Sequence, residues 1–265
     1  MPDAVGYAGG MVDEHAGPLR FDYNDAVFRQ GVESHGLDYS ILREEYRDVH
    51  PLIADRLAAS GATPVLDIGC GPTKLGTLLD GHGVRWIGVD AAIRRLEMGQ
   101  GPRVLGDALR LPFADETFGA AAALYMLYHF DDPALAVAEA HRVLAPGGLF
   151  AACAPSRFDD PELAPFLKDR APDTFDSDMA PELIGRFFEI VRIDRWDMPI
   201  YRIPDAQALW NHVVATSLIA DAEEARRVAG ELEYPLWLTK RGATVWGRKR
   251  GGSGRQAGSP AARRR

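Results

Sequence analysis

Apolar and polar positions alternate with two different periods through the middle of the chain. Five short apolar runs have the length of buried strands, at residues 64–68, 85–90, 104–105, 120–127 and 149–154. Apolar steps of three and four residues predict helices between them, at residues 74–79, 93–98 and 133–144. Asp132 followed by Pro133 is typical of a helix N-cap with proline in the first turn. Strands that alternate with helices predict an α/β fold, with a mainly parallel sheet covered on both faces.

The N-terminal region has a different pattern from this central part. Residues 1–20 are rich in glycine and acidic residues, and helical spacing follows as far as Ala59. We therefore expect a flexible lead-in and a helical cap over residues 1–60, with Pro51 separating two helices. One domain then covers residues 61–250.

The second half of that domain adds several predicted segments. They are an acidic insertion at residues 155–186, a strand at 187–196, a helical lid at 204–233 and a last strand at 243–247. Within the insertion, Asp173, Asp176 and Asp178 lack the spacing of a calcium loop. We expect a solvated acidic loop there, and no metal site.

Charge is distributed unevenly along the chain. The net charge is −8, but residues 248–265 contain seven basic residues and no acidic one, so removing them leaves −15 on the rest. A strongly negative body repels a phosphate backbone, which argues against a nucleic-acid substrate. The glycine, serine, proline and arginine content of residues 251–265 predicts a disordered basic tail.

Composition indicates an ordinary globular protein, since 46% of the residues are hydrophobic and 26% are charged. No charge-free stretch is long enough to cross a bilayer, and residues 1–18 lack the apolar run of a secretory signal. Cys70 and Cys153 provide neither a disulfide framework nor zinc-ligand spacing. We therefore expect a cytoplasmic protein, and the 26 arginines against 4 lysines are typical of a GC-rich bacterial genome.

Polar residues suited to binding follow the predicted strands. In open parallel sheets a ligand binds beyond the carboxyl ends of the strands. Gly69 and Gly71 follow the first strand, where a missing Cβ lets a ligand approach the backbone. Asp90 ends the second strand and suits the two hydroxyls of a ribose. Asp107 could accept a hydrogen bond from an exocyclic amine while the Ala108 amide donates to a ring nitrogen, so three strand ends predict a pocket for adenosine.

Two other nucleotide sites are excluded by the residues themselves. A phosphate-binding loop needs a glycine and lysine followed by serine or threonine, which residues 71–77 do not supply. A dinucleotide site needs a third glycine where this chain has Lys74. The remaining possibility is adenosine without a pyrophosphate.

The same motifs resemble the class I SAM-dependent methyltransferases, in particular the small-molecule subgroup typified by quinone-biosynthesis enzymes. The similarity covers residues 62–155 and is carried by four ordered motifs, at residues 65–72, 88–90, 106–113 and 142–148. It implies a Rossmann-like sheet of seven strands whose last strand is antiparallel, with S-adenosyl-L-methionine (SAM) as cofactor. The positions that it implies for cofactor binding are Asp67, Gly69, Gly71, Asp90, Ala91, Asp107, Ala108 and Tyr125.

Two residues near the expected cofactor need separate comment. Thr73 stands where the family usually has a third glycine, and we expect it either to cap the next helix or to crowd the methionine end. His129 follows the fourth strand on the reactive side and is a candidate general base, with a packed histidine as the alternative. Tyr125, Tyr128, His35, Tyr39 and His212 are weaker candidates.

We therefore expect SAM-dependent methyl transfer to an O, C or N atom of a small hydrophobic or aromatic metabolite, plausibly in secondary metabolism. Transfer from a sulfonium can proceed by positioning alone, so a base is not required. Two alternatives remain open: an RNA methyltransferase tethered by its basic tail, and a non-catalytic SAM-binding protein.

Overall fold

The computed structural model describes residues 49–167, 174–215, 218–219 and 221–251. The lead-in, the first helix of the cap and the basic tail were predicted for residues outside these ranges. The helices are α2 (Val49–Ser60), α3 (Lys74–Gly81), α4 (Ile93–Glu97), α5 (Pro133–Val143), α6 (Ala180–Gly185), α7 (Ala206–Ala215) and α8 (Ala222–Glu231), with 3-10 helices η2 (Leu127–His129) and η3 (Pro161–Phe166). The strands are β1 (Val65–Ile68), β2 (Trp86–Asp90), β3 (Arg103–Leu105), β4 (Phe118–Leu124), β5 (Leu144–Pro155), β6 (Glu189–Ile203) and β7 (Leu236–Arg248).

These strands form one seven-stranded sheet in the order β3-β2-β1-β4-β5-β7-β6. Strands β1 to β5 are parallel, whereas β7 runs antiparallel to both β5 and β6. The prediction of an α/β sheet with an antiparallel last strand is confirmed. The order reverses between β1 and β4, which is where open α/β sheets bind their ligands.

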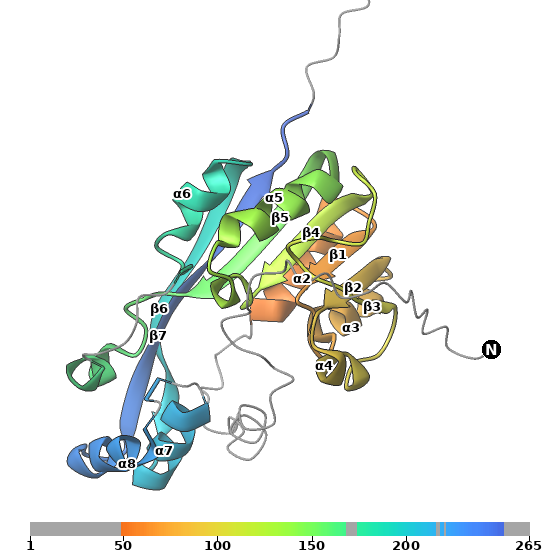
Figure 1. Ribbon diagram of the computed structural model, residues 1–265. Helices are drawn as coiled ribbons and strands as arrows, with labels where there is room; N and C mark the ends of the chain where they lie inside the picture. Colours follow the sequence, from red (N-terminus) through yellow and green to blue (C-terminus); the bar gives the residue numbers. More distant parts are fainter. Residues whose placement is uncertain (1–48, 168–173, 216–217, 220, 252–265) are drawn as a thin grey trace, which may run out of the picture.

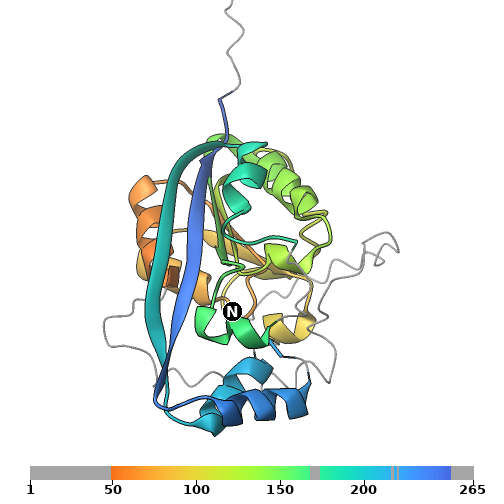
Figure 2. The same ribbon diagram turned by 90° about the vertical axis from the view of Figure 1, so that its left-hand side faces the viewer.

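Helices cover both faces of the sheet (Figures 1 and 2). Alternate residues of β4 show why: Ala120 and Ala122 pack in one apolar cluster with α2 and α3, while Ala121 and Ala123 pack in another with α5 and α6. A strand buried on both faces reads as a continuous apolar run, which is the pattern that predicted it.

Several boundaries differ from the sequence prediction. Pro51 lies inside α2 rather than between two helices. β4 ends at Leu124 rather than at residue 127, because Tyr125 has a φ of 55°, in the left-handed region that a strand cannot continue through. The two last strands are also much longer than expected.

The extra length of β6 and β7 forms a hairpin that projects beyond the sheet. Pro155 at the end of β5 pairs with Gly242, so residues 236–241 of β7 extend past the carboxyl ends of the parallel strands. Helices α7 and α8 lie at the far end of this hairpin (Figure 1). They pack around an apolar cluster of their own that includes Ile203, Leu209 and Val228. The predicted lid is therefore two helices carried on a long hairpin.

Part of the acidic insertion is buried, although Asp178 is exposed as expected. Asp176 is only 2% exposed, pairs with Arg157 at 2.7 Å and accepts hydrogen bonds from the amides of Asp178 and Met179. The expectation of a solvated loop is thus wrong for Asp176, and Asp173 lies outside the described residues.

A second set of acidic residues in the insertion holds the hairpin. Lys240 on β7 lies between Asp159 and Asp160, with nitrogen–oxygen distances of 2.6 and 2.7 Å. Burial opposes the charge on Lys240, but the two carboxylates outweigh it and hold the pKa of Lys240 above its usual range. These buried ion pairs fix the chain after β5 against β7.

Candidate functional site

A cavity of about 380 Å³ opens where β1, β2 and β4 end. Its lining includes eight of the nine residues proposed for the site from sequence: Gly69, Gly71, Asp90, Ala91, Asp107, Ala108, Tyr125 and His129. Segments separated by up to 60 positions therefore meet at one edge of the sheet. The cavity falls within the range of roughly 300–1,000 Å³ that is usual for small-molecule sites.

The glycine turn after β1 depends on its lack of side chains. Gly69 and Gly71 have φ values of 68° and 48°, which glycine adopts readily. A Cβ on Gly69 would lie 2.8 Å from Cγ of Met126, so only glycine fits against that side chain. The turn consequently exposes backbone to the cavity.

Asp90 ties the turn to the second strand. Its Oδ2 accepts a hydrogen bond from the Gly71 amide at 2.8 Å, and its Oδ1 accepts one from the Ala92 amide at 2.8 Å. Each carboxylate oxygen has a further acceptor position. Asp90 can therefore hold the turn and still accept hydrogen bonds from two ribose hydroxyls.

Thr73 neither crowds the cavity nor caps α3 through its side chain. It adopts a left-handed conformation with a φ of 60°, is fully buried, and is absent from the cavity lining. Its hydroxyl oxygen accepts a hydrogen bond from the Gln100 amide at 2.9 Å. The side chain therefore neither caps α3 nor lines the cavity, contrary to both expectations.

Asp67 is the one proposed site residue that does not line the cavity. It is 3% exposed on β1, and one of its oxygens, Oδ2, has no hydrogen-bond partner among the described residues. Burial, together with the charge of Asp90, raises its pKa to about 8. Asp67 is therefore a neutral acid at pH 7, placed below the turn rather than against a ligand.

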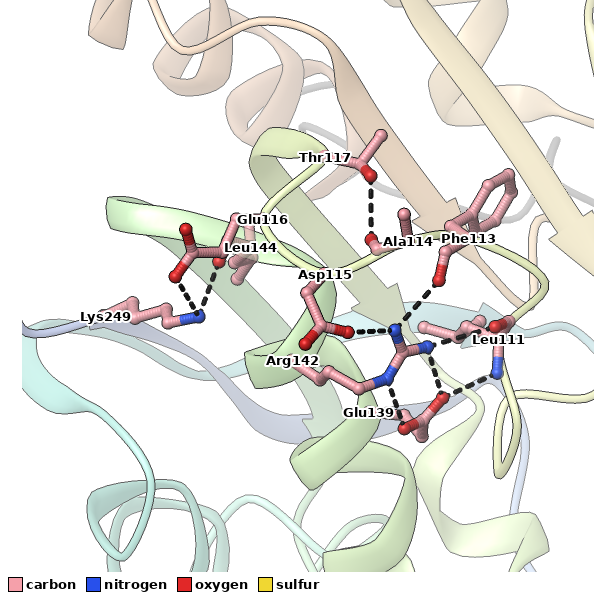
Figure 3. A network of polar contacts seen from close by, with 10 residues as sticks. All are labelled: Leu111, Phe113, Ala114, Asp115, Glu116, Thr117, Glu139, Arg142, Leu144 and Lys249. Atoms are coloured by element: carbon pink, nitrogen blue, oxygen red, sulfur yellow. Dashed lines mark hydrogen bonds and ion pairs between the residues drawn. The ribbon is translucent and has the colours of Figure 1, made fainter.

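The loop after β3 carries Asp107 and Ala108 to the cavity and is held from behind by α5 (Figure 3). The Arg142 guanidinium donates to the carbonyl oxygens of Phe113 and Leu111 at 2.8 and 3.1 Å. Glu139 accepts from Arg142 and also from the Leu111 amide at 2.8 Å. These contacts fix the loop to the helix that follows β4.

Aromatic residues line the remaining side of the cavity. Tyr125 follows β4, and its amide donates to the Cys153 carbonyl at 2.9 Å, which holds its left-handed conformation. His50 of α2 lies 6.2 Å from Tyr125 between ring centroids, and Tyr128 lies 4.6 Å from His129. His50 was not predicted, because its helix lies outside every motif.

His129 lines the cavity but is buried, with 9% of its surface exposed. Burial and then the charge of Arg95 lower its pKa to about 4. At neutral pH its imidazole is therefore uncharged. Of the weaker candidates, Tyr128 also lines the cavity, His212 lies 3.6 Å from Asp160 near the hairpin tip, and His35 and Tyr39 lie outside the described residues.

Among the described residues, no group of three or more histidine, cysteine, aspartate or glutamate side chains is arranged to hold a metal ion. Within the same residues, no helix is both long and apolar enough to cross a bilayer.

Comparison with known proteins identifies relatives of the central region. Residues 66–152 match the family model described as a methyltransferase domain. An O-methyltransferase of Aspergillus nomiae is 29% identical over 153 residues, covering 53% of this chain and 60% of that protein. A demethylmenaquinone methyltransferase of Corynebacterium kroppenstedtii is 36% identical over 101 residues, covering 37% of this chain and 44% of that protein. The chain thus spans about half the length of these curated relatives.

The fold is also found among solved structures. A SAM-dependent methyltransferase of Thermotoga maritima superimposes with a TM-score of 0.51 at 18% sequence identity. The match covers 84% of this chain and 95% of that one, so it extends well beyond residues 66–152.

Proposed function

Because the chain contains a class I SAM-dependent methyltransferase domain, we propose that the protein transfers the methyl group of SAM to an O, C or N atom of a small molecule. The observation that carries this proposal is the convergence of Gly69, Gly71, Asp90 and Asp107 on one cavity. The residues fit the cofactor. The glycine turn lines the cavity, and Asp90 keeps acceptor positions for a ribose.

The chain supplies positioning for this reaction. When bound, SAM provides a methyl group on a positively charged sulfur, which leaves as a neutral thioether. The acceptor atom forms its bond to the methyl carbon as the carbon–sulfur bond breaks, and the acceptor then loses its proton. Tyr125 and His50 border the cavity where they can orient an acceptor. Holding the two reactants in line accounts for much of the rate without acid–base chemistry.

His129 contributes to this geometry in one of two ways. A base with a pKa of about 4 takes up protons weakly at pH 7, so His129 suits an acceptor whose hydroxyl is already acidic. Otherwise the neutral ring orients the acceptor by hydrogen bonding and the proton leaves to water. A pH profile of wild type against His129→Asn separates these roles, since only the first places an ionisation of His129 in the rate.

The aromatic lining favours a hydrophobic or aromatic acceptor. His50, Tyr125, Tyr128 and Phe130 line the cavity together with Leu124. Rings and apolar side chains bind planar apolar molecules by dispersion and stacking. One relative is a demethylmenaquinone methyltransferase, and the acceptor in its name is of this kind. We therefore choose quinols among the test compounds.

Calorimetric titration with SAM and S-adenosylhomocysteine (SAH) tests the cofactor site, with NAD as a negative control. We expect binding of the first two ligands that is lost in Asp90→Ala and retained in Glu97→Ala, which removes an exposed acid from α4. Methyl-labelled SAM incubated with quinols, phenols and, separately, total RNA then tests the acceptor. Label in RNA that disappears when residues 248–265 are deleted would contradict the small-molecule assignment.

A further inference from the structure

Arg95 places a positive charge beside the glycine turn. It lies on α4, five residues after Asp90, and lines the cavity. Its Nη2 and Nε atoms are 3.5 and 3.7 Å from the point that a Cβ on Gly71 would occupy. Its charge also reaches the opposite wall, because it lowers the pKa of His129. The guanidinium therefore lies beside the glycine turn, at the lining of the cavity.

Charge is divided within the cavity lining. Asp90 and Asp107 lie at the ends of β2 and β3, where the ribose and adenine are proposed to bind. Lys74 and Arg95 flank the glycine turn instead, with Lys74 more exposed at the rim. Because the strands lie in the order β3-β2-β1, a cofactor with its adenine at Asp107 and its ribose at Asp90 extends its methionine half over the glycine turn after β1, where Arg95 lies.

The chemistry of SAM restricts what Arg95 can bind. The methionine half carries a sulfonium and an ammonium, which a guanidinium repels, and one carboxylate, which it attracts. A guanidinium matches a carboxylate with two parallel hydrogen bonds, and such charge-assisted pairs are among the strong ones. The carboxylate is thus the group of the cofactor that fits this position.

We propose that Arg95 binds the α-carboxylate of SAM and so selects nucleosides that carry an amino-acid tail. This inference rests on the proposed function and adds a residue that lies outside the sequence motifs.

The test compares two ligands that differ in the tail alone. SAH has the amino-acid tail, whereas 5′-deoxy-5′-methylthioadenosine has the same adenosine and sulfur without it. Calorimetry on Arg95→Gln should show SAH binding weakened about 10- to 100-fold, while binding of the tail-less ligand changes less than about twofold. Arg95→Lys keeps the positive charge but loses the planar guanidinium, so its affinity for SAH should lie between those of wild type and Arg95→Gln. Arg94→Gln, the exposed neighbour on α4, should match wild type for both ligands.

Each alternative outcome has a distinct meaning. Equal weakening of both ligands in Arg95→Gln and in Arg95→Lys would overturn the proposal and indicate a contact with adenosine or a role in folding. Unchanged SAH binding in Arg95→Gln would overturn it while leaving the proposed function intact. Absence of SAH binding to the wild-type protein would overturn the proposed function and this inference with it.

Discussion

Removal of the Arg142 guanidinium should release the loop that carries Asp107 and Ala108. Arg142 donates to two carbonyl oxygens of this loop and to the carboxylates of Glu139 and Asp115 (Figure 3). Arg142→Leu keeps the apolar stem on α5 but leaves those acceptors unpaired. The change therefore acts on the loop and not on the sheet.

The magnitude follows from the burial of each contact. Hydrogen bonds from a charged donor contribute about 1.5–3 kcal/mol when sheltered. Asp115 is 74% exposed, so that pair contributes at most about 1 kcal/mol. Glu139 is only 19% exposed, and its hydrogen bonds with Arg142 hold its pKa below the usual value. Because Arg142 is itself 31% exposed, solvent weakens these contacts further. We therefore expect Arg142→Leu to lower the free energy of unfolding by about 2–4 kcal/mol.

Urea denaturation measures this cost, and SAH titration measures the effect on the loop. Arg186→Leu is the matched control, because Arg186 pairs with Glu182 across exposed positions at 61% and 83%. The control should lose less than about 1 kcal/mol and bind SAH normally. If Arg142→Leu lost no more stability than the control, the assignment of this network as the support of the loop would be refuted.

Three further predictions concern single residues. The pKa of Asp67 rises from 3.8 to about 8 on folding, so the unfolded chain releases that proton at lower pH than the folded protein. The wild-type free energy of unfolding should therefore fall as pH rises from 4 to 8. Denaturation at several pH values would contradict this if the difference between Asp67→Asn and wild type did not change with pH. The pKa of His129 falls from 6.5 to about 4 on folding, so its contribution to the free energy of unfolding is complete above pH 6.5 and is lost toward pH 4. An NMR titration that places the pKa of His129 in the folded protein near 6.5 would contradict this prediction. Within α3, Gly76→Ala puts a Cβ 2.3 Å from the Trp86 ring and should cost about 1–3 kcal/mol in thermal melts, whereas Gly81→Ala meets no atom within 4 Å and should be neutral or slightly stabilising.

Local patterns were enough to predict the sheet and the positions that surround the cofactor. The α/β alternation, the Asp132 N-cap and the glycine turn each depend on a few neighbouring residues. Because parallel strands end at a common edge, motif order alone predicted that Gly69, Asp90 and Asp107 would meet.

Other features depend on contacts between distant parts of the chain. Thr73 is buried because the Gln100 amide, 27 positions away, donates to it. Asp160 is buried against Lys240, its partner, which lies 80 positions further along the chain. Arg95 and His50 come from segments without a motif, and only the folded cavity brings them together. Sequence periodicity depends on neighbouring positions, so it does not reveal such distant pairs.

The projecting hairpin has a consequence for how the molecule can open locally. Its tip has a separate apolar core around Leu209 and Val228, and is joined to the main domain by β6, β7 and the Lys240 ion pairs. A unit with its own core can open as a cooperative foldon, exchanging its amide hydrogens faster than β1 or β4 while the cofactor edge stays closed. Substitutions at the tip then leave the glycine turn and Asp90 undisturbed. Loss of structure at the tip and loss of the cofactor edge can therefore occur one without the other.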